Sequence, residues 1–185
     1  MDDVSNIEKE AEKIVRSIIN IQDNETAEVI IRAIRSTGDL DLVGTLRISK
    51  NAIKNGIKYV KNGVLVDTRM AKVALGDIAI YREPQHRNSR YYSQDLIENY
   101  KDYINNRIIM IGTSPIALIT LNKMIKNNIV KPSLVIAVPV GFVNALKSKI
   151  ELSNLDVEYI TNISVRGGVA LGISIVKALV KLSES

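Results

Sequence analysis

The sequence predicts an α/β fold, a three-layer sandwich in which helices flank a mostly parallel central sheet. The main observation is a repeated unit in the second half of the chain, in which a short apolar strand leads through a tight turn into a helix. The first two of these strands, at residues 108–111 and 134–138, are apolar throughout, as expected where both faces of a parallel sheet are covered. A chain of 185 residues can bury one full core, so we expect a single domain over residues 1–185.

The first part of the chain is predicted to be helical. Apolar residues recur at helical spacing over residues 6–20 and 24–36, and Asp23 or Asn24 is expected to cap the second helix, which ends near residues 37–39. Ser49 is expected to cap a third helix that closes at residues 62–63. Three helices would therefore precede the first parallel strand.

That strand is predicted at residues 64–66. Asp67 and Thr68 follow it and are expected to cap a short helix over residues 69–75, because their side-chain oxygens accept hydrogen bonds from free N–H groups. Residues 81–92 have no hydrophobic period, which predicts a long polar loop. Ser93 is then expected to cap a helix with an apolar face made of Leu96, Ile97, Tyr100 and Ile104.

Three strand–turn–helix units follow. The clearest has a strand at residues 108–111 and a helix at 116–126, with Ser114 as N-cap and Pro115 at the first helical position. The next has a strand at residues 134–138, which breaks at Pro139 and Gly141 and leads into a helix carrying Lys147, Ser148 and Lys149. The third has a strand at residues 157–160 and a helix at 169–182, in which Gly168 and Gly172 would let the helix lie close to the sheet.

The turns of these units are expected to form one pocket floor, because the carboxyl ends of parallel strands meet at one edge of a sheet. Three helix N-termini and Arg166 would then face a ligand, an arrangement that favours carboxylate or phosphate groups. The alternative is that these are ordinary, well-capped connections. Neither a Walker lysine pattern nor a dinucleotide glycine fingerprint is present, which argues against a nucleotide site.

Several polar residues have two interpretations. Lys149 either points back toward the pocket or lies in solvent, the commoner position for a helical lysine. His86 is either a general acid or an exposed loop residue. The arginines and tyrosines of residues 87–92 either stack on a planar ligand or on bases, or simply form an exposed loop. Asp39 and Asp41 form either a carboxylate pair or a turn after a helix.

Composition narrows the function classes. With no cysteine and a single histidine, we expect neither a metal site nor a disulfide. The acidic, polar N-terminus and the lack of a long apolar run predict a cytoplasmic protein without a membrane partner. The net charge of +5 mildly favours an anionic partner. A nucleic-acid-binding protein is an alternative, but the basic and aromatic pattern is confined to the loop at 81–92, so we expect no nucleic-acid partner.

Four segments carry a family resemblance. They are Thr37-Gly38-Asp39, Gly112-Thr113-Ser114-Pro115-Ile116-Ala117-Leu118, Pro139-Val140-Gly141-Phe142-Val143-Asn144-Ala145 with Ser148-Lys149, and Arg166-Gly167-Gly168. In this order they resemble the motifs of the precorrin-8X methylmutase family, the precorrin isomerases of cobalamin biosynthesis. The resemblance spans nearly the whole chain, and the third segment is its most specific part.

The resemblance implies an α/β sandwich, a homodimer, and a pocket for an anionic tetrapyrrole, either precorrin-8X or cobalt-precorrin-8. Members of that family move a methyl group from C11 to C12 of the macrocycle without an added cofactor, which gives hydrogenobyrinic acid or its cobalt form. The residues expected at the substrate are those of the four segments, Thr37, Gly38, Asp39, Gly112, Thr113, Ser114, Pro115, Pro139, Val140, Gly141, Phe142, Ser148, Lys149, Arg166, Gly167 and Gly168, together with Ser89 and Arg90 of the loop at 81–92.

The sequence departs from the family at the position of its proton donor. Arg35 stands where the family has a histidine that protonates the tetrapyrrole. Arginine does not titrate in proteins, so Arg35 is unsuited to that proton transfer, although it can pair with a carboxylate. One hypothesis is an isomerase that uses another donor, such as His86 or a bound water. The other is a noncatalytic tetrapyrrole-binding relative.

Overall fold

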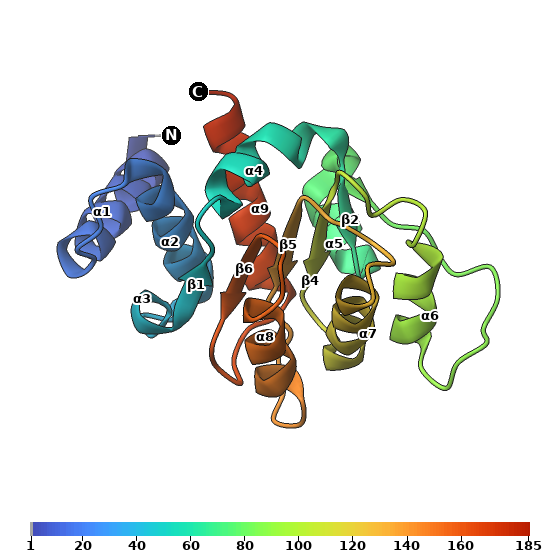
Figure 1. Ribbon diagram of the computed structural model, residues 1–185. Helices are drawn as coiled ribbons and strands as arrows, with labels where there is room; N and C mark the ends of the chain where they lie inside the picture. The colour runs from blue at the N-terminus through green and yellow to red at the C-terminus, as the bar shows by residue number, and fades with distance from the viewer. Residues whose placement is uncertain (1) are drawn as a thin grey trace.

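A computed structural model describes residues 2–185, whose strands form one six-stranded sheet in the order β1-β6-β5-β4-β2-β3 (Figure 1). β1 pairs with β6 in antiparallel fashion, and all other neighbouring strands are parallel. The strands are β1 (Leu46–Ile48), β2 (Val64–Val66), β3 (Ala79–Ile80), β4 (Ile108–Ile111), β5 (Leu134–Ala137) and β6 (Tyr159–Asn162).

Helices cover both faces of the sheet, which confirms the predicted three-layer α/β fold (Figure 1). One face carries α2 (Asn24–Thr37), α4 (Ala52–Tyr59), α5 (Arg69–Leu75) and α9 (Val169–Ser183), with α1 (Asp2–Ile18) packed against α2. The other face carries α6 (Tyr92–Asn99), α7 (Pro115–Lys126) and α8 (Ala145–Ser153). The short helix α3 (Leu42–Thr45) and the 3-10 turns η1 (Val60–Asn62) and η2 (Gly76–Ile78) complete the described elements.

Alternate residues of the strands β2, β4 and β5 enter two separate cores. Met110 and Ile136 lie in the core beneath α9, whereas Ile109 and Val135 lie in the core beneath α7. All four side chains are at most 1% exposed. These three strands are continuously apolar because both of their faces are excluded from water.

Several predicted helix signals are confirmed. The side chains of Asp23, Thr68 and Ser114 each accept a hydrogen bond from an N–H in the first turn of α2, α5 and α7. Gly38 ends α2 in the left-handed conformation, with φ of 67°, and Pro115 opens α7. Gly172 lies so close to Met110 that a Cβ at Gly172 would be 2.8 Å from the Met110 sulfur, so α9 does lie close on the sheet.

Other predicted caps are wrong because the side chains form hydrogen bonds with residues that are distant in the sequence. Ser49 does not cap α4: its hydroxyl donates to Glu158 at 2.5 Å and accepts from the N–H of Tyr159 at 2.8 Å, which joins it to β6. Ser93 does not cap α6 but bonds to Ser114 at 2.9 Å. Asp67 does not cap α5, since its carboxylate turns toward the end of β4.

Some boundaries also differ from the prediction. The last strand lies at Tyr159–Asn162, two residues later than predicted, and β1, β3 and α3 were not predicted at all. These are elements of two to four residues, too short to show a hydrophobic period. In α1 the predicted apolar face is only partly buried, because Ile7, Ile14 and Ile18 remain exposed.

Candidate functional site

The turns after β4, β5 and β6 meet at the carboxyl edge of the sheet, in the lower part of Figure 1. Gly141 donates its N–H to the carbonyl of Val165 at 2.9 Å, and Gly168 donates its N–H to the carbonyl of Val138 at 2.7 Å. Pro115 lies against the turn after β5, 3.9 Å from where a Cβ at Gly141 would be. The structure thus brings together three of the four motif segments.

The fourth segment, at the end of α2, closes a pocket of about 370 Å³ against the turn after β6. Arg166, on the turn after β6, reaches across to the residues that follow α2, because its Nη1 donates to Asp39 at 2.9 Å and to Asp41 at 2.7 Å. Asp39 and Asp41 are therefore held together by one guanidinium. The residues lining the pocket are Thr37, Gly38, Asp39, Leu42, Arg166, Gly167 and Leu171.

The N–H groups at the start of the turn after β4 do not face a ligand. Asp67 accepts hydrogen bonds from the N–H groups of Gly112 at 3.1 Å and Thr113 at 2.8 Å. Burial raises the pKa of Asp67, although these N–H groups act in the opposite direction. The N–H groups of Gly112 and Thr113, which precede α7, are thus bonded within the protein, and the side chain of the N-cap Ser114 accepts the N–H of Ala117 in the first turn of α7.

Removing the Asp67 carboxylate is expected to destabilise the site edge. In Asp67→Ala the buried N–H group of Gly112 and the partly buried N–H group of Thr113 lose their acceptor, so we expect the free energy of unfolding to fall by about 2 to 3 kcal/mol. Urea denaturation measures this, with the exposed Asp102→Ala as a matched control. Equal stability of the two variants would contradict the role given to Asp67.

The N-termini of α8 and α9 are open in a way that the N-terminus of α7 is not. Neither Asn144 nor Gly168 makes a side-chain cap hydrogen bond. Helix N-termini carry partial positive charge and free N–H donors. These two helix ends therefore supply the anion-favouring character at this edge.

The turn after β5 presents apolar side chains to solvent. Phe142 is 91% exposed, and Val140 and Val143 are also exposed, whereas Pro139 is buried. Exposed apolar side chains next to a polar pocket suit a ligand with flat, apolar faces.

Ser148 and Lys149 lie inside the protein. The Ser148 hydroxyl donates to the carbonyl of Ala145, within α8. Lys149 is 0% exposed, and its ammonium donates to Asn162 Oδ1 at 3.1 Å and to the carbonyl of Arg166 at 3.0 Å. Of the two interpretations of Lys149, a position in solvent is wrong: the side chain reaches back to the turn after β6.

Arg35 lies on a different face of α2 from the 370 Å³ pocket. It lines a separate groove of about 480 Å³, together with Lys9, Glu12, Glu28, Arg32, Ser36 and Lys181. Arg35 and Thr37 are thus close in sequence but line different cavities.

His86, Ser89 and Arg90 belong to the long loop that follows β3, at the far end of the sheet from β6 (Figure 1). Asp95 holds this loop by accepting the N–H of Ser89 at 2.9 Å, and His86 lines a small pocket of about 240 Å³ with Asp95. The structure therefore does not bring these predicted residues to the pocket at Arg166 within one chain.

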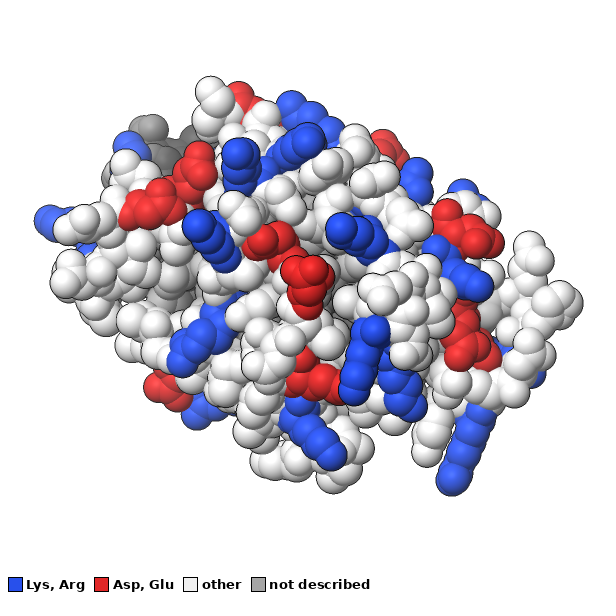
Figure 2. Space-filling view, viewed as in Figure 1, with Lys and Arg blue, Asp and Glu red and all other residues white. Residues whose placement is uncertain are grey.

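The aromatic and basic side chains of the same loop contact one another. Arg87 lies over the ring of Tyr92 and Arg90 over the ring of Tyr91, and burial raises the pKa of Tyr92 to about 12. Figure 2 shows basic and acidic side chains interspersed on this face of the molecule, with no continuous basic surface. Neither observation favours a nucleic-acid interface.

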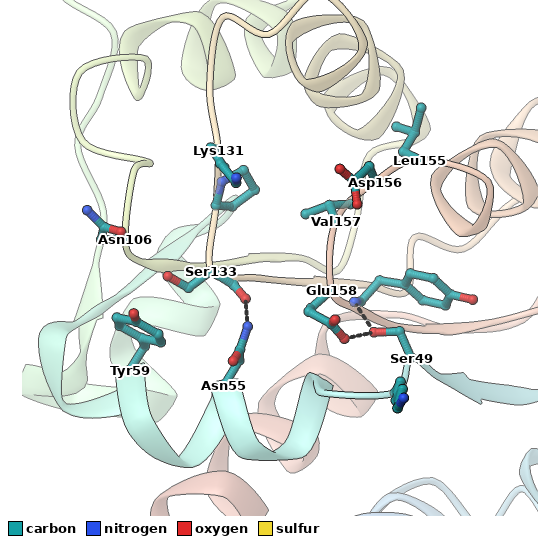
Figure 3. A pocket seen from close by; sticks show the side chains of 13 residues that line it. Ser49, Asn55, Tyr59, Asn106, Lys131, Ser133, Leu155, Asp156, Val157 and Glu158 are labelled. Carbon is teal, nitrogen blue, oxygen red and sulfur yellow. Dashed lines mark hydrogen bonds between the residues drawn. The ribbon is translucent and has the colours of Figure 1, made fainter.

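A larger pocket lies elsewhere. It has about 530 Å³ and opens at the amino ends of β5 and β6, where Glu158 accepts a hydrogen bond from Ser49 (Figure 3). None of the predicted site residues lines it. Within residues 2–185, no group of three or more histidine, cysteine or acidic side chains is placed to hold a metal ion, and no helix is long and apolar enough to cross a membrane.

Comparison with known proteins decides the family. Residues 6–182 match the family described as CbiC: Precorrin-8X methylmutase. The chain belongs to the precorrin-8X methylmutase family. The resemblance seen in the four motif segments is thereby confirmed, and with it the assignment to a family of isomerases of cobalamin biosynthesis.

Named relatives of the precorrin-8X methylmutase family cover most of the chain. A cobalt-precorrin-8 methylmutase from Priestia megaterium is 31% identical over 88% of this chain and 80% of its own length. A protein of the same name from Leptospira interrogans is 30% identical over 86% and 84%. The crystal structure of a precorrin-8X methylmutase from Thermus thermophilus superposes with a TM-score of 0.86 at 25% identity, covering 97% of this chain and 96% of that one.

Sequence reasoning missed two buried residues that shape the site. Asp67 was interpreted as a cap, although its position directly after a strand at the carboxyl edge was a usable signal. Asn162 lay outside the predicted strand, and no sequence signal singled it out. Its side chain donates to the carbonyl of Arg166 at 2.8 Å.

Proposed function

We propose that this chain is a methylmutase that moves a methyl group from C11 to C12 of cobalt-precorrin-8 or precorrin-8X, and so yields the cobalt form of hydrogenobyrinic acid or hydrogenobyrinic acid itself. The observation that carries the proposal is the meeting of the four motif segments at one edge of the sheet, with Arg166 across the pocket. We place the protein in the cytoplasm.

The geometry suits an anionic macrocycle. Arg166 bonds to Asp39 and Asp41 through Nη1, and its guanidinium carries further N–H donors for a ligand carboxylate. The open N-termini of α8 and α9 add to this attraction. Phe142 and Val143 offer apolar surface to the flat face of the rings.

The acid must be a group other than Arg35, because arginine stays protonated in proteins. His86 or a bound water is the proposed donor. Since His86 lies at the far end of the sheet from the pocket, it would act on a pocket of a second copy, which agrees with the homodimer that we propose.

The proposal is tested by incubating the purified protein with cobalt-precorrin-8 and, separately, with precorrin-8X, and following the conversion to the corrin by absorbance. We expect conversion of at least one substrate by the wild type, with Arg35→His within about 10-fold of it, because Arg35 lines a separate groove. No conversion of either substrate by the wild type would overturn the proposal. Activity confined to Arg35→His would identify a binding protein that has lost its acid.

A further inference from the structure

Lys149 is a buried cation that the proposed reaction does not explain. Its side chain is 0% exposed, and both of its hydrogen-bond acceptors, Asn162 Oδ1 and the carbonyl of Arg166, are neutral. Burying an ammonium without a counter-charge is costly, so such a lysine is not expected from stability alone.

The contacts of Lys149 converge on one peptide group. The carbonyl of Arg166 accepts a hydrogen bond from Lys149 at 3.0 Å and another from Asn162 at 2.8 Å. On the other side of this residue, its N–H donates to the hydroxyl of Ser164 at 3.1 Å. The backbone of Arg166 is thus held at both its carbonyl and its N–H.

The next residues fix the same turn against β5. A Cβ at Gly167 would overlap the carbonyl oxygen of Val138, and the N–H of Gly168 bonds to that oxygen. With its backbone held in this way, Arg166 extends its guanidinium to Asp39 and Asp41 at the end of α2.

We infer that Lys149 is a positioning residue: its buried ammonium fixes the backbone of Arg166, so that the guanidinium spans the pocket, and adds a positive charge behind that residue. This inference rests on the proposed function, because it assigns Arg166 to a carboxylate of the ligand. The cluster at the pocket rim has two carboxylates against one guanidinium, so the charge of Lys149 offsets an acidic surplus.

The polar and charged groups around the Lys149 ammonium come from several elements. Neutral Asn162 faces it from β6, and on the turn after β6 the guanidinium of Arg166 points to Asp39 and Asp41. Toward α7, Glu151 of its own helix bonds to Asn122. Burial lowers the pKa of Lys149 to about 8. The ammonium therefore loses its charge at mildly alkaline pH.

A ligand-free experiment tests the titration through stability. The unfolded lysine keeps its proton up to its ordinary pKa of 10.5, whereas the folded lysine loses it near 8, so the folded state binds fewer protons between these values. The wild type should gain stability relative to Lys149→Met as the pH rises through this window. Thermal unfolding at several pH values measures this, and Lys123→Met, at an exposed lysine of α7, should show no such trend.

A crystal structure of Lys149→Met without ligand tests the positioning. We expect the guanidinium of Arg166 to leave Asp39 and Asp41 while the fold is kept. An unchanged Arg166 in that structure would overturn the inference, whatever the outcome of the conversion assay.

Binding of hydrogenobyrinic acid by calorimetric titration then links position to function. We expect the wild type to bind about 10-fold more weakly near pH 9.5 than near pH 7, and Lys149→Met to bind about 10-fold more weakly near pH 7 with little pH dependence. Wild-type affinity and pH profile in a folded Lys149→Met would contradict the inference. Absence of binding by the wild type would instead count against the proposed function.

Discussion

Replacing Gly167 with alanine is expected to lower the free energy of unfolding by about 3 kcal/mol or more and to abolish activity. Gly167 has φ of 148°, a conformation that side chains with a Cβ rarely adopt. A Cβ there would also overlap the carbonyl oxygen of Val138, which already accepts the N–H of Gly168. Because backbone atoms form the obstacle, the turn has to move away from β5.

The matched control for this experiment is Gly44→Ala. Gly44 is an exposed residue of α3, and nothing lies within 4 Å of where its Cβ would be. We expect its stability in urea denaturation to stay within about 1 kcal/mol of the wild type. A Gly167→Ala protein as stable as Gly44→Ala would show that the turn is not held as described.

Replacing Arg166 with methionine is expected to reduce kcat/KM for the tetrapyrrole about 100-fold, because a charge-assisted bond to a carboxylate is lost. The variant also leaves Asp39 and Asp41 uncompensated, so they repel an anionic ligand. Since the Arg166 side chain is 60% exposed, the fold should be little affected.

Two further variants separate charge from geometry at Arg166. Arg166→Lys keeps the charge but not the planar fork, and we expect it to recover only part of the activity. Lys123→Met removes one exposed positive charge from α7 and should match the wild type. If Arg166→Met retains full kcat/KM in steady-state kinetics, the pocket at the end of α2 is not the substrate site.

The predictable part of the fold is the part that local signals determine. The unit from β4 to α7 has a continuous apolar strand, a serine cap and a proline at the first helical position, all of which act within a few residues. The edge strand β1 was missed because its three residues gain their structure from pairing with β6. The Ser49 cap was wrongly predicted for a similar reason, because the Ser49 hydroxyl donates to Glu158, a residue 109 positions away.

The candidate site was predictable in its location but not in its detail. The rule that ligands collect at the carboxyl edge of a parallel sheet placed the turns correctly. The direction of each N–H and ammonium group depends on distant partners, however. Asp67 accepts hydrogen bonds from two N–H groups of the turn after β4, and Asn162 accepts one from the buried ammonium of Lys149. Such partners follow from packing and not from local sequence.

The antiparallel pairing of β1 with β6 also has a consequence for how the protein folds. It pairs Leu46 with Asn162, and α2 packs on α9. The first third of the chain therefore reaches its final structure only by contact with the last third. During synthesis, Asp39 lacks its ion-pair partner until Arg166 has emerged from the ribosome. Pairing over such sequence separations is slow, because a long loop must close before any contact rewards it. The pocket is therefore expected to form late, once β1 has paired with β6, and until then the apolar faces of the N-terminal helices stay exposed.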